Sequence, residues 1–156
     1  MGERKRGATR REVLIGGLAG GLVATIKVEN ANAAPEQLRA AIRNVVGTAQ
    51  VRKGRVELIV PPLVENGNTV SLVVAVDSPM TAADYVKSIY VFTEKNPQPN
   101  VIAVHLGPRA GKARITTRFR LADTQTITAI ARMSDGTFWS TTADSIVTLA
   151  ACVEGL

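Results

Sequence analysis

From Val56 onward, the sequence is a series of short runs rich in Val, Ile and Thr, separated by turn-forming residues. β-Branched residues favour strands, whereas Asn, Asp, Gly and Pro favour turns. Within Ala113–Leu121, apolar side chains and Thr117 alternate with Thr116 and three arginines, the period of a strand with one face toward a core. The predicted strands are Val56–Val60, Val70–Val76, Val86–Thr93, Val101–Leu106, Ala113–Leu121, Thr126–Met133 and Phe138–Leu149.

About seven short strands at this spacing predict a mainly β protein, an immunoglobulin-like β-sandwich. Asp135-Gly136, between the last two runs, predicts a tight hairpin. Before the first run, apolar residues recur every three or four positions over Pro35–Val46, which predicts a short N-terminal amphipathic helix ended by Gly47. The polar and basic stretch Gln50–Arg55 predicts a connection.

The first 33 residues have the features of an export signal. Arg10-Arg11 precedes the apolar run Val13–Ala24, which is shorter than the roughly 20 residues of a membrane span. Ala31-Asn32-Ala33 then offers a small-x-small cleavage site, and the whole segment resembles twin-arginine leaders. We therefore expect residues 1–33 to be cleaved, the mature chain to begin at Ala34 in a bacterial periplasm, and no stable membrane insertion.

The net charge of +6 does not indicate nucleic-acid binding. The predicted signal, residues 1–33, carries six basic and three acidic side chains. The other 13 basic and 10 acidic groups leave a net charge of +3 for the mature chain. That value is ordinary for a globular domain, so we expect no nucleic-acid partner.

Cys152 is the single cysteine of the sequence. It follows the last predicted strand, so we expect a helix-plus-sandwich domain over residues 34–149 and a flexible tail over 150–156. A lone thiol in an oxidising compartment predicts either intermolecular pairing or a working sulfhydryl. Burial as a small apolar residue is the competing interpretation, but chain ends are usually mobile unless docked.

Several stretches of the sequence resemble the SoxY family, the sulfur-carrier subunit of the bacterial thiosulfate-oxidising Sox system. The twin-arginine leader fits this family as well. The matching stretches are Val64–Val70, Val76–Thr81 with Asp84–Val86, Glu94–Pro99, Thr117–Ala122 with Thr124-Gln125, and Met133–Gly136.

The resemblance implies a non-catalytic carrier that works in thiosulfate oxidation. It implies an immunoglobulin-like fold and a heterodimer with a SoxZ-like subunit. A c-type cytochrome enzyme would join Cys152 to thiosulfate, and a hydrolase would then release sulfate. No cofactor is expected other than the sulfur intermediates bound covalently to Cys152, and these are reasonable adducts for a thiol.

The end of the sequence departs from the family pattern, which reads Gly-Gly-Cys-Gly-Gly. Here Ala150-Ala151 precedes Cys152, and Val153-Glu154-Gly155-Leu156 follows it. Glycine permits any backbone angle, whereas valine is stiff and Glu154 adds bulk and negative charge. We therefore expect a divergent or impaired carrier.

Two other classes of function remain as alternatives. The chain could be an exported β-sandwich binding or structural module whose tail thiol forms an intermolecular disulfide. A thiol enzyme is disfavoured, because no evident base lies near Cys152 in the sequence and no catalytic triad is apparent. His105, Met133 and Cys152 are too few and too scattered for a metal site.

Two further features have more than one interpretation. The row Arg114, Arg118 and Arg120 predicts a solvated strand face, or one that attracts thiosulfate or an acidic partner. Phe138 and Trp139 are predicted to lie in the core rather than at an interface.

Overall fold

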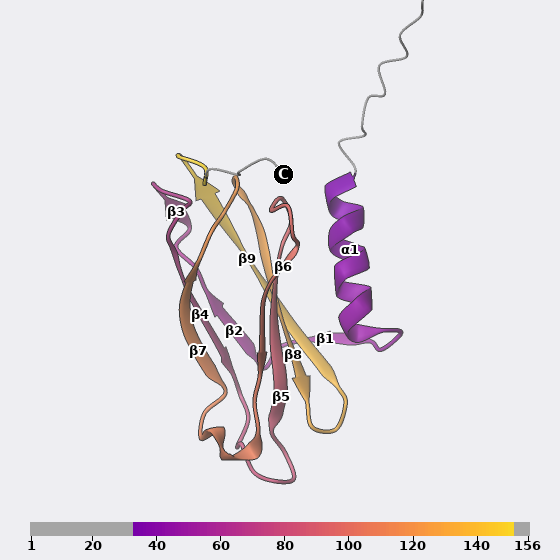
Figure 1. Cartoon of the computed structure of the whole chain (residues 1–156). Coiled ribbons are helices and arrows are strands. Elements are labelled where there is room, and N and C mark those ends of the chain that lie inside the picture. The colour runs from indigo at the N-terminus through magenta and orange to yellow at the C-terminus, as the bar shows by residue number, and fades with distance from the viewer. Residues whose placement is uncertain (1–32, 152–156) are drawn as a thin grey trace, which may run out of the picture. The chain divides into compact units, whose positions relative to one another are not determined.

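Two β-sheets face each other, and one helix covers the outer face of the larger sheet (Figure 1). The computed structural model describes residues 33–151, so the predicted export signal, apart from Ala33, and Cys152 lie outside the described part. The mainly β, immunoglobulin-like sandwich with an N-terminal helix is confirmed. Its elements are α1 (Ala33–Val46), β1 (Val51–Lys53), β2 (Val56–Ile59), β3 (Leu63–Val64), β4 (Val70–Val76), β5 (Val86–Thr93), β6 (Asn100–His105), the short 3-10 turn η1 (Pro108–Ala110), β7 (Arg114–Phe119), β8 (Gln125–Met133) and β9 (Phe138–Val147).

The larger sheet has the strand order β1-β9-β8-β5-β6, and β3 also pairs with β9. The smaller sheet has the order β2-β4-β7. All pairings are antiparallel except those of β1 and β3 with β9, which are parallel. Strands β6 and β7 are therefore edge strands on the same side of the sandwich, one in each sheet.

Alternation along the strands separates two apolar layers. In β4, Val70, Leu72, Val74 and Val76 are buried and face the larger sheet, as a period of two requires. The larger sheet is buried on both faces, one against the smaller sheet and one against α1. This explains why six of the eight residues of β5 are buried instead of every second one.

The helix uses the apolar stripe predicted from its sequence. Gly47 follows its last turn with φ +62°, and its N–H donates to Arg43 O at 2.8 Å. This left-handed residue closes the helix where glycine is favoured. The apolar stripe packs on Phe92, Ile130 and Phe138 of the larger sheet, and it consists of Leu38, Ala41, Ile42, Val45 and Val46.

No helix in residues 33–151 is long and apolar enough to cross a membrane.

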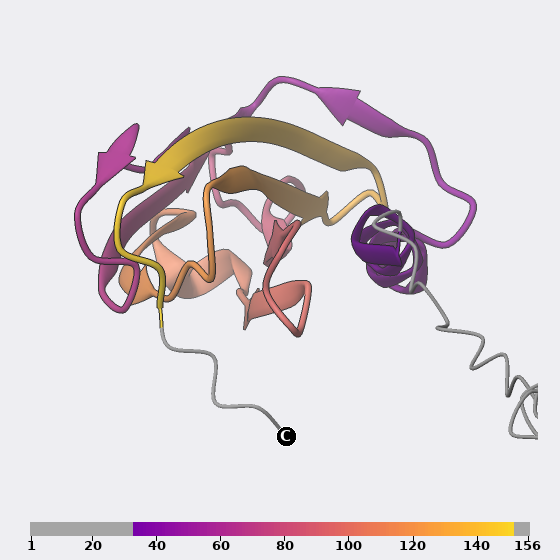
Figure 2. The same ribbon diagram turned by 90° about the horizontal axis from the view of Figure 1, so that it is seen from above.

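A segment at one side of the sandwich connects the two sheets. Between residues 51 and 64 the chain pairs with β9 in β1, crosses to β4 in β2 and returns to β9 in β3 (Figure 2). Ser145 Oγ donates to Pro61 O at 2.8 Å, and Ile146 N donates to Pro62 O at 2.9 Å. The two consecutive prolines thus offer carbonyl acceptors to β9 at the crossing.

The structure confirms all seven predicted strands within two residues at each end, together with the Asp135-Gly136 hairpin between β8 and β9. The expectation that Gln50–Arg55 is only a connection is wrong for Val51–Lys53, which forms β1. β3 was not predicted either. Both strands are too short to show a period in the sequence, and both depend on pairing with β9, far along the chain.

Candidate functional site

The described chain ends in a hydrogen-bonded junction of three segments. Gly67, in the turn before β4, donates its N–H to Leu149 O at 2.8 Å and accepts from Leu121 N at 2.8 Å. Ala151 N in turn donates to Leu121 O at 3.0 Å, and Ala151 is buried. The backbone immediately before Cys152 is therefore held against the sandwich at a defined point.

Gly67 makes this junction possible because it has no side chain. A Cβ at this position would lie 2.4 Å from Leu121 O and 2.8 Å from Ala151 N, distances that real Cβ atoms do not adopt. The turn is further organised by Asn66 Oδ1, which accepts from the backbone N–H and the side-chain amide of Asn68 at 3.0 and 3.1 Å. Neighbouring backbones can approach this closely only at a glycine.

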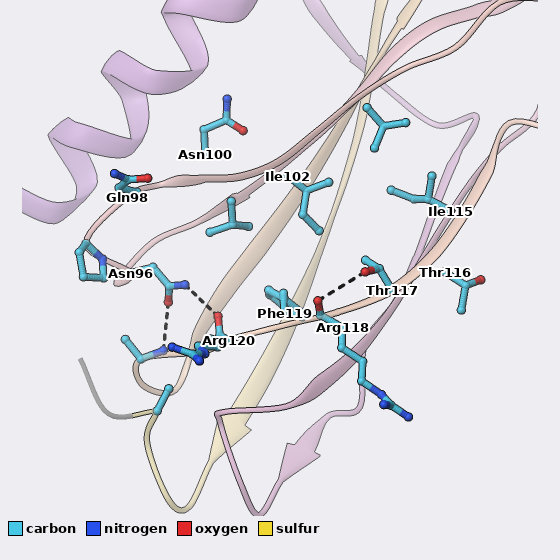
Figure 3. A pocket seen from close by; sticks show the side chains of 15 residues that line it. Asn96, Gln98, Asn100, Ile102, Ile115, Thr116, Thr117, Arg118, Phe119 and Arg120 are labelled. Carbon is cyan, nitrogen blue, oxygen red and sulfur yellow. Dashed lines mark hydrogen bonds between the residues drawn. The ribbon is translucent and has the colours of Figure 1, made fainter. Parts of the chain in front are cut away.

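An open groove of about 800 Å³ begins beside Ala151 and runs between β6 and β7. Its walls come from the edge strands of the two sheets, and Ile102, Ile115 and Phe119 supply apolar side chains to it (Figure 3). Thr117 also lines the groove. The sequence pattern predicts that Thr117 faces inward, yet it is exposed, because the sheets diverge there and leave it uncovered.

One end of the groove has a polar rim that is fixed by Asn96. Its Nδ2 donates to Arg120 O at 2.8 Å, and its Oδ1 accepts from Ala122 N at 3.0 Å (Figure 3). The same Oδ1 also accepts from Gln125 Nε2 at 3.0 Å. This one side chain thus ties the β5–β6 connection to the segment that follows β7. The rim is therefore a preformed structure made from residues far apart in the sequence.

A charged pair reinforces the same rim. Lys95 Nζ lies 2.9 Å from Asp123 Oδ2, and the Lys95 backbone N–H donates to Gln125 Oε1 at 2.7 Å. The hydrogen bond from Lys95 lowers the pKa of the Asp123 carboxyl, and the Thr124 backbone N–H lowers this pKa further. Both charged side chains are solvent-exposed.

The predicted arginine row does not act as one surface. Arg114, Arg118 and Arg120 are all exposed, as the strand period predicts. Only Arg118 and Arg120 line the groove, and Figure 3 shows Arg120 beside Asn96 whereas the Arg118 side chain extends away from Ile102 and Phe119. The 15 residues that line the groove include these two arginines and no Asp or Glu. The groove therefore favours an apolar occupant that carries negative charge.

The other residues singled out from the sequence lie away from this end. His105 is exposed at the end of β6, with its ring edge-on to Tyr90 at 6.2 Å. Phe138 is buried beneath α1, as predicted, whereas Trp139 is half-buried with the Arg52 and Arg55 guanidinium groups over its ring. No group of three or more His, Cys, Asp or Glu side chains in residues 33–151 is arranged to hold a metal ion.

The fold and the site define an immunoglobulin-like β-sandwich that holds Ala151, the residue before the single cysteine of the sequence, beside an open groove. The sequence matches the family described as "Sulfur oxidation protein SoxY" over residues 42–152, which is more than half of the chain. The chain belongs to the SoxY family. No curated protein sequence was found to match it.

Solved structures share the fold. The sulfur carrier protein SoxY from Chlorobium limicola f thiosulfatophilum superposes with a TM-score of 0.62 and 24% identity, over 74% of this chain and 99% of that chain. A superoxide reductase (neelaredoxin) from Ignicoccus hospitalis gives 0.52 and 18%, over 60% and 80%. A putative superoxide reductase from Thermotoga maritima gives 0.52 and 20%, over 63% and 87%. At these identities, the likeness concerns the fold alone.

Proposed function

We propose that this protein is a sulfur carrier of thiosulfate oxidation that holds sulfur intermediates covalently on Cys152 for other enzymes to process. The observation that carries the proposal is the match to the SoxY family, which runs as far as residue 152, the cysteine itself. The fixed position of Ala151, one residue earlier, supports it, because a carrier needs a firm base from which a short segment can extend.

The chemistry proposed for Cys152 is a sequence of balanced steps. Joining the thiol to thiosulfate forms an S–S bond and releases a proton and two electrons, which a c-type cytochrome enzyme accepts. Hydrolysis by a second enzyme then breaks the bond to the sulfonate group, releases sulfate and leaves a persulfide on the cysteine. In this scheme the carrier itself catalyses neither step.

The loading step can be tested by mass spectrometry. Purified mature protein, incubated with thiosulfate and the cytochrome enzyme, is expected to gain the mass of one thiosulfate adduct, and Cys152→Ser is expected to gain nothing. An unmodified wild-type protein would contradict the proposal. Cys152→Ser also tests the alternative of a binding module. In that case the wild type would form a covalent dimer that a reductant breaks, and the variant would lose only this dimer.

The altered tail is proposed to slow loading without abolishing it. Val153 and Glu154 stand where the family pattern has two glycines. Both residues permit fewer backbone conformations than glycine, and Glu154 adds a negative charge next to an anionic substrate. Val153→Gly with Glu154→Gly is expected to load thiosulfate faster than the wild type in the same assay. A slower variant would show that these residues assist recognition by the enzyme.

We also propose that the protein acts in the periplasm after export by the twin-arginine route. The support is the sequence of residues 1–33. Replacing Arg10 and Arg11 by lysine is expected to leave the unprocessed chain in the cytoplasm, whereas the wild type should appear in the periplasmic fraction with Ala34 as its first residue. Processing of the double variant at the wild-type rate would argue against this route.

A SoxZ-like subunit is the proposed stable partner. Leu63 of β3 and Ile146 of β9 are register partners, and their side chains are 58% and 55% exposed. Exposed apolar side chains that lie together on a sheet edge are typical of a surface that is covered by another protein. Co-purification of the two mature chains as a complex, unaffected by Cys152→Ser, is the expected result.

A further inference from the structure

We propose that β7 binds an extended segment of another protein as an added strand, and that this segment alternates apolar with acidic side chains. The first support is the open edge of β7. In residues 33–151 this strand pairs only with β4, and the groove lies along its other edge, with β6 as the opposite wall. An unpaired strand edge offers backbone N–H and C=O groups to an added strand.

The backbone groups that face this open edge follow from the register of β7 with β4. Val76 N donates to Ala113 O at 2.9 Å, where the pairing of the two strands begins. Along an antiparallel pair, residues that bond to the partner strand alternate with residues whose N–H and C=O point away from it. The odd-numbered residues of β7 therefore bond to β4. Three residues direct their N–H and C=O groups to the groove, namely Arg114, Thr116 and Arg118.

The apolar lining of the groove determines one half of the segment. Ile115 and Phe119 of β7 line the groove, and Ile102 of β6 lines it from the opposite wall (Figure 3). Successive side chains of an added strand point to opposite faces, so every second one would meet this apolar lining. Apolar residues are therefore expected at those positions. β7 has six residues, so a segment of roughly six or seven residues is long enough to cover it.

The arginines of β7 determine the other half of the segment. Arg114 and Arg118 are exposed on the outer face of the smaller sheet. Their register partners on β4 are the uncharged Ala75 and Ser71, and neither arginine forms a salt bridge within residues 33–151. Opposite charges on neighbouring strands attract each other, and no Asp or Glu lines the groove to repel an anion. Acidic residues are therefore expected at the outward positions.

The same arginines favour another protein over a second copy of this chain. Antiparallel pairing of β7 with β7 of a second copy, centred on Thr116, would place Arg114 of each copy beside Arg118 of the other. Like charges directly opposite each other destabilise a strand pair, whereas carboxylates at these positions stabilise it. A protein bound to β7 would lie beside Ala151, which is part of the groove wall. The inference concerns a binding surface, so it stands or falls independently of what Cys152 carries.

Fluorescence anisotropy with a labelled peptide tests the proposal. The probe is Val-Asp-Val-Thr-Val-Asp-Val, whose pattern is the same in both directions, so it fits a parallel or an antiparallel strand. We expect saturable binding to the mature chain, and equal binding to Cys152→Ser. Arg114→Glu with Arg118→Glu is expected to weaken binding by about tenfold or more, and to bind a probe with Lys in place of Asp more tightly than the wild type does. Lys53→Glu with Arg132→Glu, which makes the same change in net charge on the larger sheet, is the matched control and should change little.

Thr116→Pro tests the backbone pairing separately from charge. Proline removes an N–H that points to the groove and does not bond to β4, so the fold should be retained, which thermal unfolding by circular dichroism checks. Binding of the probe is expected to weaken by about tenfold or more. A wild type without saturable binding, or binding that either the proline variant or the double arginine variant leaves unchanged, would overturn the proposal. Self-association of the mature chain in sedimentation velocity that Thr116→Pro abolishes would overturn it in favour of a second copy.

Discussion

Gly67 leaves no space for a side chain at the junction that holds Ala151. Gly67→Ala places a methyl group against Leu121 O and Ala151 N, so we expect the free energy of unfolding to fall by about 1–3 kcal/mol, as in other overpacked sites. Urea denaturation measures this change. Gly107→Ala is the control, since a Cβ at Gly107 meets nothing within 4 Å. Equal stability of the two variants would show that the junction is looser than described.

Thr93 carries a buried hydroxyl for which the described residues provide no hydrogen-bond partner. Thr93→Val removes an unsatisfied polar group and keeps the shape of the side chain. We therefore expect the free energy of unfolding to be unchanged or higher by up to about 1 kcal/mol. Thr126→Val is the comparison, because Thr126 Oγ1 donates to Asp144 at 2.7 Å and that bond would be lost. A Thr93→Val protein that is less stable than Thr126→Val would contradict this account.

Asp123, at the groove rim, is expected to make the stability of the fold depend on pH. Its pKa is lowered from the ordinary value of 3.8 in the folded protein by Lys95 and Thr124. A lowered folded-state pKa stabilises the fold at pH values above the ordinary pKa, and this contribution is lost as the pH falls through the folded-state value. The stability difference between wild type and Asp123→Asn should therefore shrink on acidification from neutral pH. A difference that is constant with pH would exclude the carboxylate as its source.

At the scale of elements, α1 depends on its contact with the larger sheet. Ile42 lies in the apolar stripe but is only partly buried. We therefore expect Ile42→Ala to cost about 1–2 kcal/mol, less than the 2–5 kcal/mol of a fully buried position. Asn44→Ala, on the exposed face of the same helix, should change stability little. Circular dichroism during thermal unfolding compares the two, and equal midpoints would show that the helix contact contributes nothing.

Element positions follow from local sequence wherever a run is long enough to show its period. The limits of β4 and β5 coincide with the predicted runs, because β-branched residues fill them and turn residues bound them. β1 and β3 could not be predicted, since each is set by its register with β9 and not by its own composition. For the same reason, the contact of Gly67 with Leu121 and Ala151 has no signal in the sequence.

The candidate site was predictable only in its chemistry. A single cysteine beyond the last strand drew attention to residue 152, and the strand period predicted that Arg118 in β7 and Arg120 just after it are exposed. The groove was not predicted, because it arises where two edge strands from different sheets diverge. Such a feature depends on the packing of the sheets, which one sequence does not specify directly.

At the scale of the whole molecule, binding of the proposed SoxZ-like subunit should depend on the exposed apolar side chains of Leu63 and Ile146, near the end of β9. Aspartate at both Leu63 and Ile146 is expected to weaken binding of a SoxZ-like subunit by about tenfold or more, because a buried charge without a partner opposes association. Isothermal titration calorimetry measures the Kd. Ser71→Asp, on the exposed outer face of the smaller sheet, is the control. An unchanged Kd for the double variant would place the partner elsewhere.

The crossing segment between β1 and β3 gives the sandwich an asymmetry in stiffness. Backbone pairing from residues 51–64 ties both sheets together along β9, whereas no strand pairing joins β6 to β7 in the described chain. On the opposite side, the sheets are linked through side chains such as Asn96, which bonds to Arg120 O and Ala122 N, and not through a strand ladder. We therefore expect the width of the groove to vary more than the spacing of the sheets beside β9.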